Sequence, residues 1–166
     1  MNKELHGTFI SLGNSKNDFS RAIRLIELAQ HLLPRPIVAQ IGYTNYSSPH
    51  FNNIKFVTES KFIQYIALSK LIISHAGAGV IINCLKEGKK PIIIPRLSKF
   101  DEHIDDHQLN LAIKMDAVKL AFYVNNSGAL IELLKNAKGE KFKYQNNNQI
   151  DAVKLIETEI CIQINK

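Results

Sequence analysis

Short apolar runs alternate with longer amphipathic stretches along this chain, and the alternation indicates how it folds. The runs are rich in β-branched residues, whereas the stretches between them repeat their apolar positions at helical spacing. The runs that we interpret as strands are Thr8 to Leu12, Ile37 to Ile41, Ile54 to Val57, Leu71 to Ser74, Pro91 to Ile94 and Val118 to Tyr123. Strands that alternate with helices are typical of an α/β protein. The pattern predicts a Rossmann-like doubly wound parallel sheet of about six strands.

The helices are expected between these runs. In the first, apolar residues fall on one face of a segment that Asp18 is suited to cap and Pro34 to end. The others are expected at about Lys61 to Lys70, Gly79 to Glu87, Asp106 to Met115, Gly128 to Asn136 and Gln149 to Ile160. The stretch from Gly139 to Gln149 is linker-like and leads into the last of them.

The length favours a single domain over residues 1–166, because 166 residues suffice for one buried core and not for two. Within it, residues 149–166 are expected to form a C-terminal helix and tail. An apolar stripe runs along that helix and consists of Ile150, Val153, Ile156 and Ile160. Such a stripe packs on its own sheet or docks a partner, and the sequence leaves both possibilities open.

Composition and charge narrow the setting of the protein. Lysine and arginine number 21 against 15 acidic residues, a surplus that favours anionic partners such as a phosphate ligand or a lipid surface, or is only a solvated basic face. Cys84 and Cys161 form no paired motif, so neither a disulfide framework nor a zinc ribbon is indicated. The first residues lack the apolar stretch of a signal peptide. We therefore expect a cytoplasmic protein and no nucleic-acid partner.

In a doubly wound sheet, ligands bind beyond the carboxyl ends of the strands. The loops at that edge are Gly13-Asn14-Ser15, His75-Ala76-Gly77-Ala78-Gly79 and Arg96 to Gln108. In the second loop, two glycines let backbone N–H groups approach a ligand, the following helix dipole favours a diphosphate, and the His75 side chain offers a further hydrogen-bond donor. A tight strand-to-helix connection would also explain these glycines.

Two common phosphate fingerprints are not found. Gly13 stands alone after the first predicted strand, so the glycine-rich pattern of NAD-binding domains is missing. Gly88-Lys89 is followed by Lys90 and not by Ser or Thr, so the sequence lacks a P-loop.

The third loop is dense in hydrogen-bonding side chains and has three interpretations. Asp105 and Gln108 have the spacing of a capping box and would then simply start the next helix. A metal site of His103, Asp106 and His107 is possible, but it straddles a helix start and lacks a firm ligand spacing. Alternatively, Asp106 and Gln108 face the same cleft and bind sugar hydroxyls.

Several motifs in a fixed order carry a resemblance to a known family. They are Ile73-Ser74-His75-Ala76-Gly77-Ala78-Gly79, Gly88-Lys89, Ile94-Pro95-Arg96-Leu97 and Glu102-His103-Ile104-Asp105-Asp106-His107-Gln108, and Gln40-Ile41-Gly42-Tyr43 also fits. This string closely resembles the C-terminal domain of family 28 glycosyltransferases. It is most similar to small stand-alone members, the PssE-type subunits of bacterial polysaccharide synthesis and the soluble subunit of the eukaryotic two-part UDP-GlcNAc transferase acting on dolichol diphosphate.

The resemblance implies the C-terminal half of a GT-B fold and a hexosyltransferase active only with a partner. Such a domain binds a UDP-sugar without a metal or other cofactor. Its partner would be a membrane-anchored PssD-type subunit, which binds the lipid-linked acceptor and recruits this chain to the inner face of the membrane. By position, donor diphosphate binding falls on Gly13, Asn14, His75, Ala76, Gly77, Ala78 and Gly79. Donor-sugar binding falls on Asp106, His107 and Gln108. No catalytic residue is assigned to this chain, because the acceptor sits on the partner.

Two positions depart from the family pattern. Where the pattern has Ser and a ribose-binding Glu, this chain has Val80 and Asn83. Asn83 can still hydrogen-bond ribose, but without the charge that strengthens such bonds. An alternative function is therefore a non-catalytic UDP-sugar-binding or scaffolding subunit, and a weaker one is a nucleotide-binding enzyme that needs no partner.

Overall fold

The strands of the computed structural model form one sheet in which every neighbouring pair is parallel. The strand order is β3-β2-β1-β4-β5-β6, that of a doubly wound Rossmann-like sheet. The strands are β1 (Thr8–Ser11), β2 (Ile37–Gln40), β3 (Asn52–Ile54), β4 (Leu71–His75), β5 (Ile92–Ile94) and β6 (Phe122–Tyr123). The structure describes residues 7–137, 142–144, 154, 156 and 158. The predicted fold class is confirmed.

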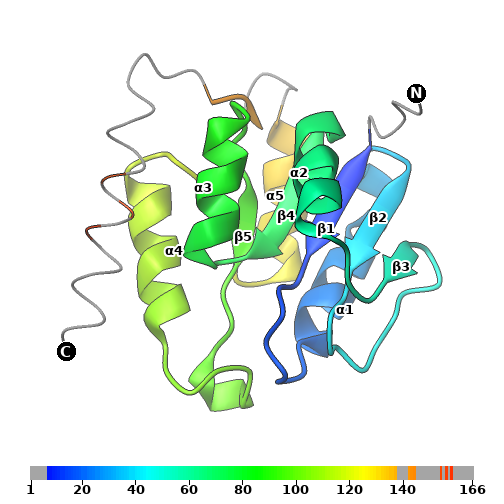
Figure 1. The fold of residues 1–166 in the computed structure, drawn as a ribbon, viewed down its shortest axis with the longest axis horizontal. Coiled ribbons are helices and arrows are strands. Elements are labelled where there is room, and N and C mark those ends of the chain that lie inside the picture. Colours follow the sequence, from blue (N-terminus) through cyan, green and yellow to red (C-terminus); the bar gives the residue numbers. More distant parts are fainter. Residues whose placement is uncertain (1–6, 138–141, 145–153, 155, 157, 159–166) are drawn as a thin grey trace.

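Helices cover both faces of the sheet (Figure 1). They are α1 (Ser20–Leu28), α2 (Glu59–Leu68), α3 (Ala78–Lys86), α4 (His107–Ala117) and α5 (Ser127–Asn136), with short 3₁₀ turns η1 (Gln30–Leu32) and η2 (Ser98–Phe100). Helices α2, α3 and α4 lie on one face, and α1 and α5 lie on the other. In the described part of the chain, no helix combines the length and the apolar character that crossing a membrane requires.

Each central strand is apolar because it is buried on both faces. Phe9 packs in the core under α2, α3 and α4, and its neighbour Ile10 packs in the core under α1 and α5. Ile10 lies beside Ile73 in the sheet, and Ile73 lies beside Ile92. This two-sided burial explains why these strands read as continuous apolar runs rather than as alternating ones.

The predicted bounds of two strands were wrong. The third strand is Asn52–Ile54 instead of Ile54 to Val57, because pairing with Val38–Gln40 decides its position and two asparagines hide it from a propensity argument. The sixth begins at Phe122, because helix α4 continues to Ala117 and Val118 forms its C-cap.

The ends of the predicted helices differ in smaller ways. The N-cap of α1 is Phe19, although the Asp18 carboxylate does accept a hydrogen bond from the first N–H of the helix, at Ser20. The linker and the C-terminal helix and tail expected over 139–166 lie largely outside the described residues. Of the stripe on that helix, Ile156 is described, and it is buried in the core under α2, α3 and α4.

Candidate functional site

A cleft of about 330 Å³ opens where β1, β2 and β4 end. Its lining consists of Ser11, Gly13, Asn14, Gln40, Val57, Glu59, Phe62, His75 and Val80. The chain leaves β1 toward β2 on one side and returns to β4 on the other, so the strand order reverses here. Ligands of doubly wound sheets bind at such a switch point. Gly13, Asn14 and His75, predicted from two separate loops, therefore meet in one cleft.

The imidazole of His75 sits between two glycines. A Cβ atom on Gly13 would lie 2.7 Å from the ring Cε1, and one on Gly77 would lie 2.3 Å from Nε2. Both distances are far shorter than a carbon tolerates. Gly13 also has a φ of +77°, a conformation that other residues rarely adopt. The glycines thus make room for the ring and let two backbone segments approach the cleft.

Helix α3 begins at the mouth of this cleft. Its N-cap is Gly77, which has no side chain to satisfy the first turn, and the first N–H bonded to Gly77 O is that of Ile81, at 3.2 Å. The N–H groups of Ala78, Gly79 and Val80 precede the first intrahelical bond and are free to bind an anion. A Cβ on Gly79 would meet nothing within 4 Å among the described residues, so the backbone is open there.

The His75 ring is neutral at physiological pH. Burial lowers its pKa to about 4, the hydrogen bond to the Ser11 carbonyl opposes this, and the electrostatic effects of Arg96 and His103 lower the pKa further. Nδ1 lies 3.4 Å from the carbonyl oxygen of Ser11, which can only accept, so Nδ1 carries the proton. Nε2 then holds a lone pair. The ring therefore offers no donor at Nε2 at neutral pH, so donation to a ligand falls to other groups at the cleft, such as the N–H groups at the start of α3 and the side-chain amide of Asn14.

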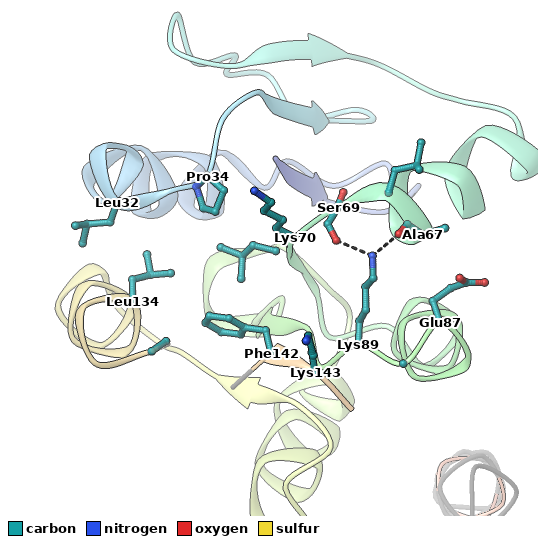
Figure 2. Close-up of a pocket in the computed structure, with 14 residues that line it drawn as sticks. Leu32, Pro34, Ala67, Ser69, Lys70, Glu87, Lys89, Leu134, Phe142 and Lys143 are labelled. Carbon is teal, nitrogen blue, oxygen red and sulfur yellow. Dashed lines mark hydrogen bonds between the residues drawn. The ribbon is translucent and has the colours of Figure 1, made fainter. Parts of the chain in front are cut away.

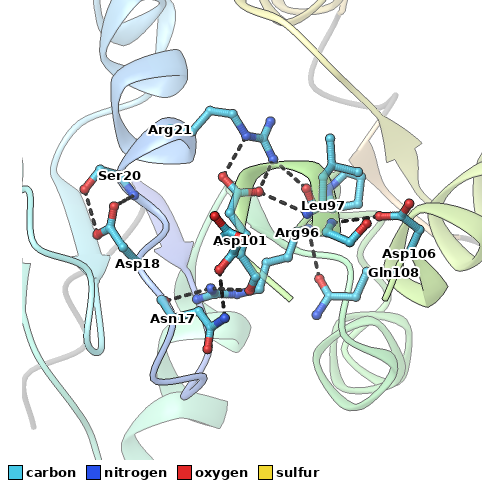
Figure 3. A network of polar contacts seen from close by, with 12 residues as sticks. Asn17, Asp18, Ser20, Arg21, Arg96, Leu97, Asp101, Asp106 and Gln108 are labelled. Carbon is cyan, nitrogen blue, oxygen red and sulfur yellow. Dashed lines mark hydrogen bonds and ion pairs between the residues drawn. The ribbon is translucent and has the colours of Figure 1, made fainter. Parts of the chain in front are cut away.

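A buried guanidinium joins the loop after β1 to the loop after β5. Arg96 is 1% exposed. It donates to the carbonyl oxygens of Leu12, Asn17 and Glu102 at 3.0, 2.9 and 3.2 Å. Figure 3 shows Arg96 beside Asn17. Its guanidinium also lies 4.4 Å from the centre of the Phe19 ring. Arg96 thus ties the loop after β1, which borders the cleft, to the loop after β5.

An ion pair closes the same network. Arg21 donates to both carboxylate oxygens of Glu102, at 2.8 and 2.7 Å, and to the carbonyl oxygen of Pro95 (Figure 3). Glu102 also accepts a hydrogen bond from the N–H of Leu97. The pair is bidentate, and the Glu102 side chain is 4% exposed, so little water surrounds the acceptor.

The family model for the glycosyltransferase family 28 C-terminal domain matches residues 17–160, most of the chain. This chain belongs to that family. The match includes the second predicted loop, which holds His75 and leads into α3. It also includes the third, which begins with Arg96.

Among curated relatives, the family 28 chain is 32% identical over 145 residues to the UDP-N-acetylglucosamine transferase subunit ALG13 of Candida albicans, covering 75% of this chain and 46% of that protein. The subunit of the same name from Kluyveromyces lactis is 36% identical over 72 residues, which cover 43% of this chain and 34% of the Kluyveromyces protein. This chain thus spans less than half the length of these two relatives.

Solved structures support the fold of the family 28 chain. The glycotransferase of kitacinnamycin superposes with a TM-score of 0.60 at 14% identity, over 92% of this chain and 39% of that one. MurG of Acinetobacter baumannii superposes with a TM-score of 0.56 at 16% identity, over 95% and 51%. At this identity the likeness concerns architecture alone. It agrees with the predicted C-terminal half of a GT-B fold.

Other predicted site residues of this family 28 chain lie beyond the cleft lining. Asn83 is half-buried on α3, one turn beyond its start. Asp106 accepts a hydrogen bond from the N–H of Ser98 at 2.8 Å. Gln108 is 6% exposed and accepts one from the N–H of Arg96 at 3.2 Å. The roles of these side chains toward a ribose or a sugar stay predictions.

The capping-box interpretation was wrong. The N-cap of α4 is Asp106, Asp105 accepts from the N–H of His107, and the Gln108 side chain turns inward to Arg96 instead of back to the helix start. The Gln108 side chain could bond either the helix start or the N–H of Arg96. It bonds Arg96, where it is buried against the loop after β5.

Polar side chains at and next to the floor of the cleft received no role in the sequence analysis, although Gln40 and Ser74 belong to the motifs of the family resemblance. Ser11, Gln40 and Ser74 are buried at the ends of adjacent strands. Gln40 accepts from Ser11 Oγ and donates to the Asn14 side chain, while Ser74 donates to the Ser11 carbonyl. The sequence did contain a signal for these residues, because each is a polar residue at the end of an otherwise apolar strand. Glu59 and Phe62, from the start of α2, had no such signal.

A larger cavity of about 660 Å³ lies at the opposite edge of the sheet, where the strands begin (Figure 2). Lys89 reaches into it and donates to the carbonyl oxygens of Ile66, Ala67 and Ser69, at 2.6, 2.5 and 2.6 Å. These bonds satisfy carbonyls at the end of α2, so Lys89 has a structural role. Among the described residues no α-helix begins at this edge, whereas α3 begins at the smaller cleft, and we therefore place the functional site there.

The neutral state of His75 predicts a pH-dependent stability. Because its folded pKa of about 4 lies below the ordinary 6.5, the unfolded chain binds more protons between these values. The contribution of His75 to the free energy of unfolding is fully present above about pH 6.5. It is lost as the pH falls toward 4, and the loss is at most about 3 kcal/mol. Urea unfolding from pH 7 to 4 should show a loss that His75→Asn reduces. An NMR titration of His75 with a midpoint near 6.5 would contradict this.

Proposed function

We propose that this chain is the donor-binding subunit of a two-part glycosyltransferase, which transfers a hexose-type sugar from UDP to a lipid-linked acceptor in polysaccharide biosynthesis. One observation carries the proposal: the uncapped first turn of α3 opens on the cleft at the switch point of the sheet. Free N–H groups and the helix dipole suit a diphosphate. Membership of family 28, and relatives named as UDP-N-acetylglucosamine transferase subunits, support a UDP-sugar as the ligand.

The chemistry follows from this placement. During transfer, the bond between the anomeric carbon and the diphosphate oxygen breaks, a bond to the acceptor oxygen forms, and UDP leaves with additional negative charge. The N–H groups of Ala78, Gly79 and Val80 would stabilise that charge, so this step needs no metal. Gly13 and Asn14 would border the diphosphate, and Asp106, His107 and Gln108 would approach the sugar.

The acceptor side is assigned to a partner. The acceptor hydroxyl must lose a proton to a base within hydrogen-bond reach. We place that base on a membrane-anchored PssD-type subunit, which would also recruit this chain to the cytoplasmic face of the membrane. This chain would contribute positioning and leaving-group stabilisation.

Calorimetry and a transfer assay test the proposal together. The chain should bind UDP and at least one UDP-sugar without a partner, and should transfer sugar to membrane lipid only when the partner subunit is present. Transfer by the chain without a partner would contradict the two-part arrangement. Absence of UDP binding would favour the scaffolding alternative, which the departures at Val80 and Asn83 keep open.

Asn83 provides a finer prediction about the ribose. Replacing it with alanine should weaken UDP binding about threefold to tenfold, the value of one neutral hydrogen bond. Asn83→Glu, the residue of the family pattern, should strengthen binding, because a charged acceptor forms a stronger bond. Asn110→Ala, on the exposed face of α4, is the control in the same calorimetric titration. Equal affinities for all the variants would exclude a ribose contact at this position.

A further inference from the structure

A group of three potential metal ligands lies at the end of the loop before α4 and at the first residue of that helix, beyond the residues that line the cleft. It consists of His103, Asp105 and His107, and one ligand atom from each lies within 4.8 Å of the other two. The sequence had suggested Asp106 as the carboxylate of such a group. In the structure Asp106 turns to the N–H of Ser98 instead, and Asp105 takes its place.

We propose that His103, Asp105 and His107 bind one borderline divalent cation of the Zn²⁺ class. Two imidazole nitrogens and one carboxylate oxygen are a common set for Zn²⁺ at three of four tetrahedral positions, and water completes the shell. Ligand bonds of about 2.1 Å place ligand atoms about 3.4 Å apart in a tetrahedron. Nδ1 of His103 lies 3.2 Å from Oδ1 of Asp105, close to that separation.

The second histidine contacts the same carboxylate oxygen. Nδ1 of His107 hydrogen-bonds Oδ1 of Asp105, and the two imidazole rings lie with their centres 4.4 Å apart, edge to face. Without a cation, Asp105 links the three groups: its carboxylate hydrogen-bonds Nδ1 of His107, and its backbone N–H donates to Nδ1 of His103 at 3.4 Å. Binding forms two nitrogen–metal bonds and one oxygen–metal bond. A proton on a ligating Nδ1 moves to Nε2 of the same ring, and only a ring that carries two protons releases one to solvent.

Both ends of this loop are anchored, which limits the ordering cost of binding. Glu102 precedes the first ligand and is buried in its bidentate pair with Arg21. Gln108 follows the last ligand and is buried against the N–H of Arg96. The ligand side chains themselves are 21%, 54% and 38% exposed in chain order, so an ion and its water can reach them.

The inference concerns cation binding and does not need the proposed function. Transfer as proposed uses backbone donors, whereas the cation would bind in the loop before α4. The two share one side chain, because His107 is also expected near the donor sugar. The test therefore contains no nucleotide: a chain that binds Zn²⁺ but not UDP would retain this inference and lose the proposed function.

Calorimetric titration of the tag-free chain with Zn²⁺ tests the site. We expect one saturable site, weakened roughly tenfold or more by His103→Ala, Asp105→Asn or His107→Ala. His31→Ala, an exposed histidine on η1, is the matched control and should bind like the unchanged chain. Absence of saturable binding, or equal affinity in His103→Ala and His31→Ala, would overturn the proposal.

A second measurement keeps the test decisive if a variant fails to fold. In the unchanged chain, Zn²⁺ should shift the imidazole NMR signals of His103 and His107 at one equivalent and leave that of His31 in place. Shifts spread equally over exposed histidines would indicate adventitious binding and would contradict the site.

Discussion

Replacing Arg96 with alanine is expected to lower the free energy of unfolding by about 3 to 5 kcal/mol. The guanidinium is buried and donates to three carbonyl oxygens, those of Leu12, Asn17 and Glu102. Its removal leaves these acceptors without a donor and opens a cavity beside Phe19. A loss of this size is a large share of the stability of an ordinary domain.

Two further variants separate the network from a general effect of charge. Arg96→Lys keeps the charge but cannot reach three divergent acceptors, so it should fall between the alanine variant and the unchanged protein. Arg24→Ala removes an exposed arginine that lies 4.1 Å over the Tyr46 ring, and should cost no more than about 1 kcal/mol. Urea unfolding followed by circular dichroism compares them. Equal losses for Arg96→Ala and Arg24→Ala would refute the role of the network.

The second large effect is expected from Gly77→Ala, which should weaken UDP binding about a hundredfold, or roughly 2.8 kcal/mol. The backbone of Gly77, with φ of −85° and ψ of 133°, suits alanine, so the effect is steric. The new Cβ would lie 2.3 Å from Nε2 of His75. To escape it, the ring must move within the cleft where we place the diphosphate.

A double substitution tests this cause directly. Removing the ring in Gly77→Ala/His75→Ala should recover part of the lost affinity, because the clashing partner is gone. Gly79→Ala is the control for folding: its Cβ meets nothing within 4 Å of the described residues, and alanine favours a helix by about 1 kcal/mol. It should therefore keep or raise the stability. Unchanged UDP affinity in Gly77→Ala would contradict the placement of the donor.

Much of the fold could be predicted because its signals are local. The central strands are buried on both faces, as at Phe9 and Ile10, so apolar runs reveal them. The edge strand at Asn52–Ile54 could not be found this way, because pairing with β2 creates it and its own asparagines oppose it.

The site was predicted where one short segment builds it, and missed where distant segments meet. The loop from His75 to Gly79 combines glycines with the start of a helix, and both features are visible in sequence. The Arg96 network joins residues more than 70 positions apart, and a single sequence does not reveal such a pairing. The capping-box interpretation failed for another reason: Gln108 has the spacing of a local cap, but burial turns it to the N–H of Arg96, 12 positions earlier in the same loop.

If the amides at the start of α3 bind the diphosphate of a UDP-sugar donor, they should respond first when UDP is added to ¹⁵N-labelled protein. In an NMR titration, the amide signals of Ala78, Gly79 and Val80 should shift most, with those of Gly13 and Asn14 next. Shifts confined to the opposite cavity, around Leu71 and Lys89, or signals that do not respond to UDP at all would show that the diphosphate does not bind at the start of α3.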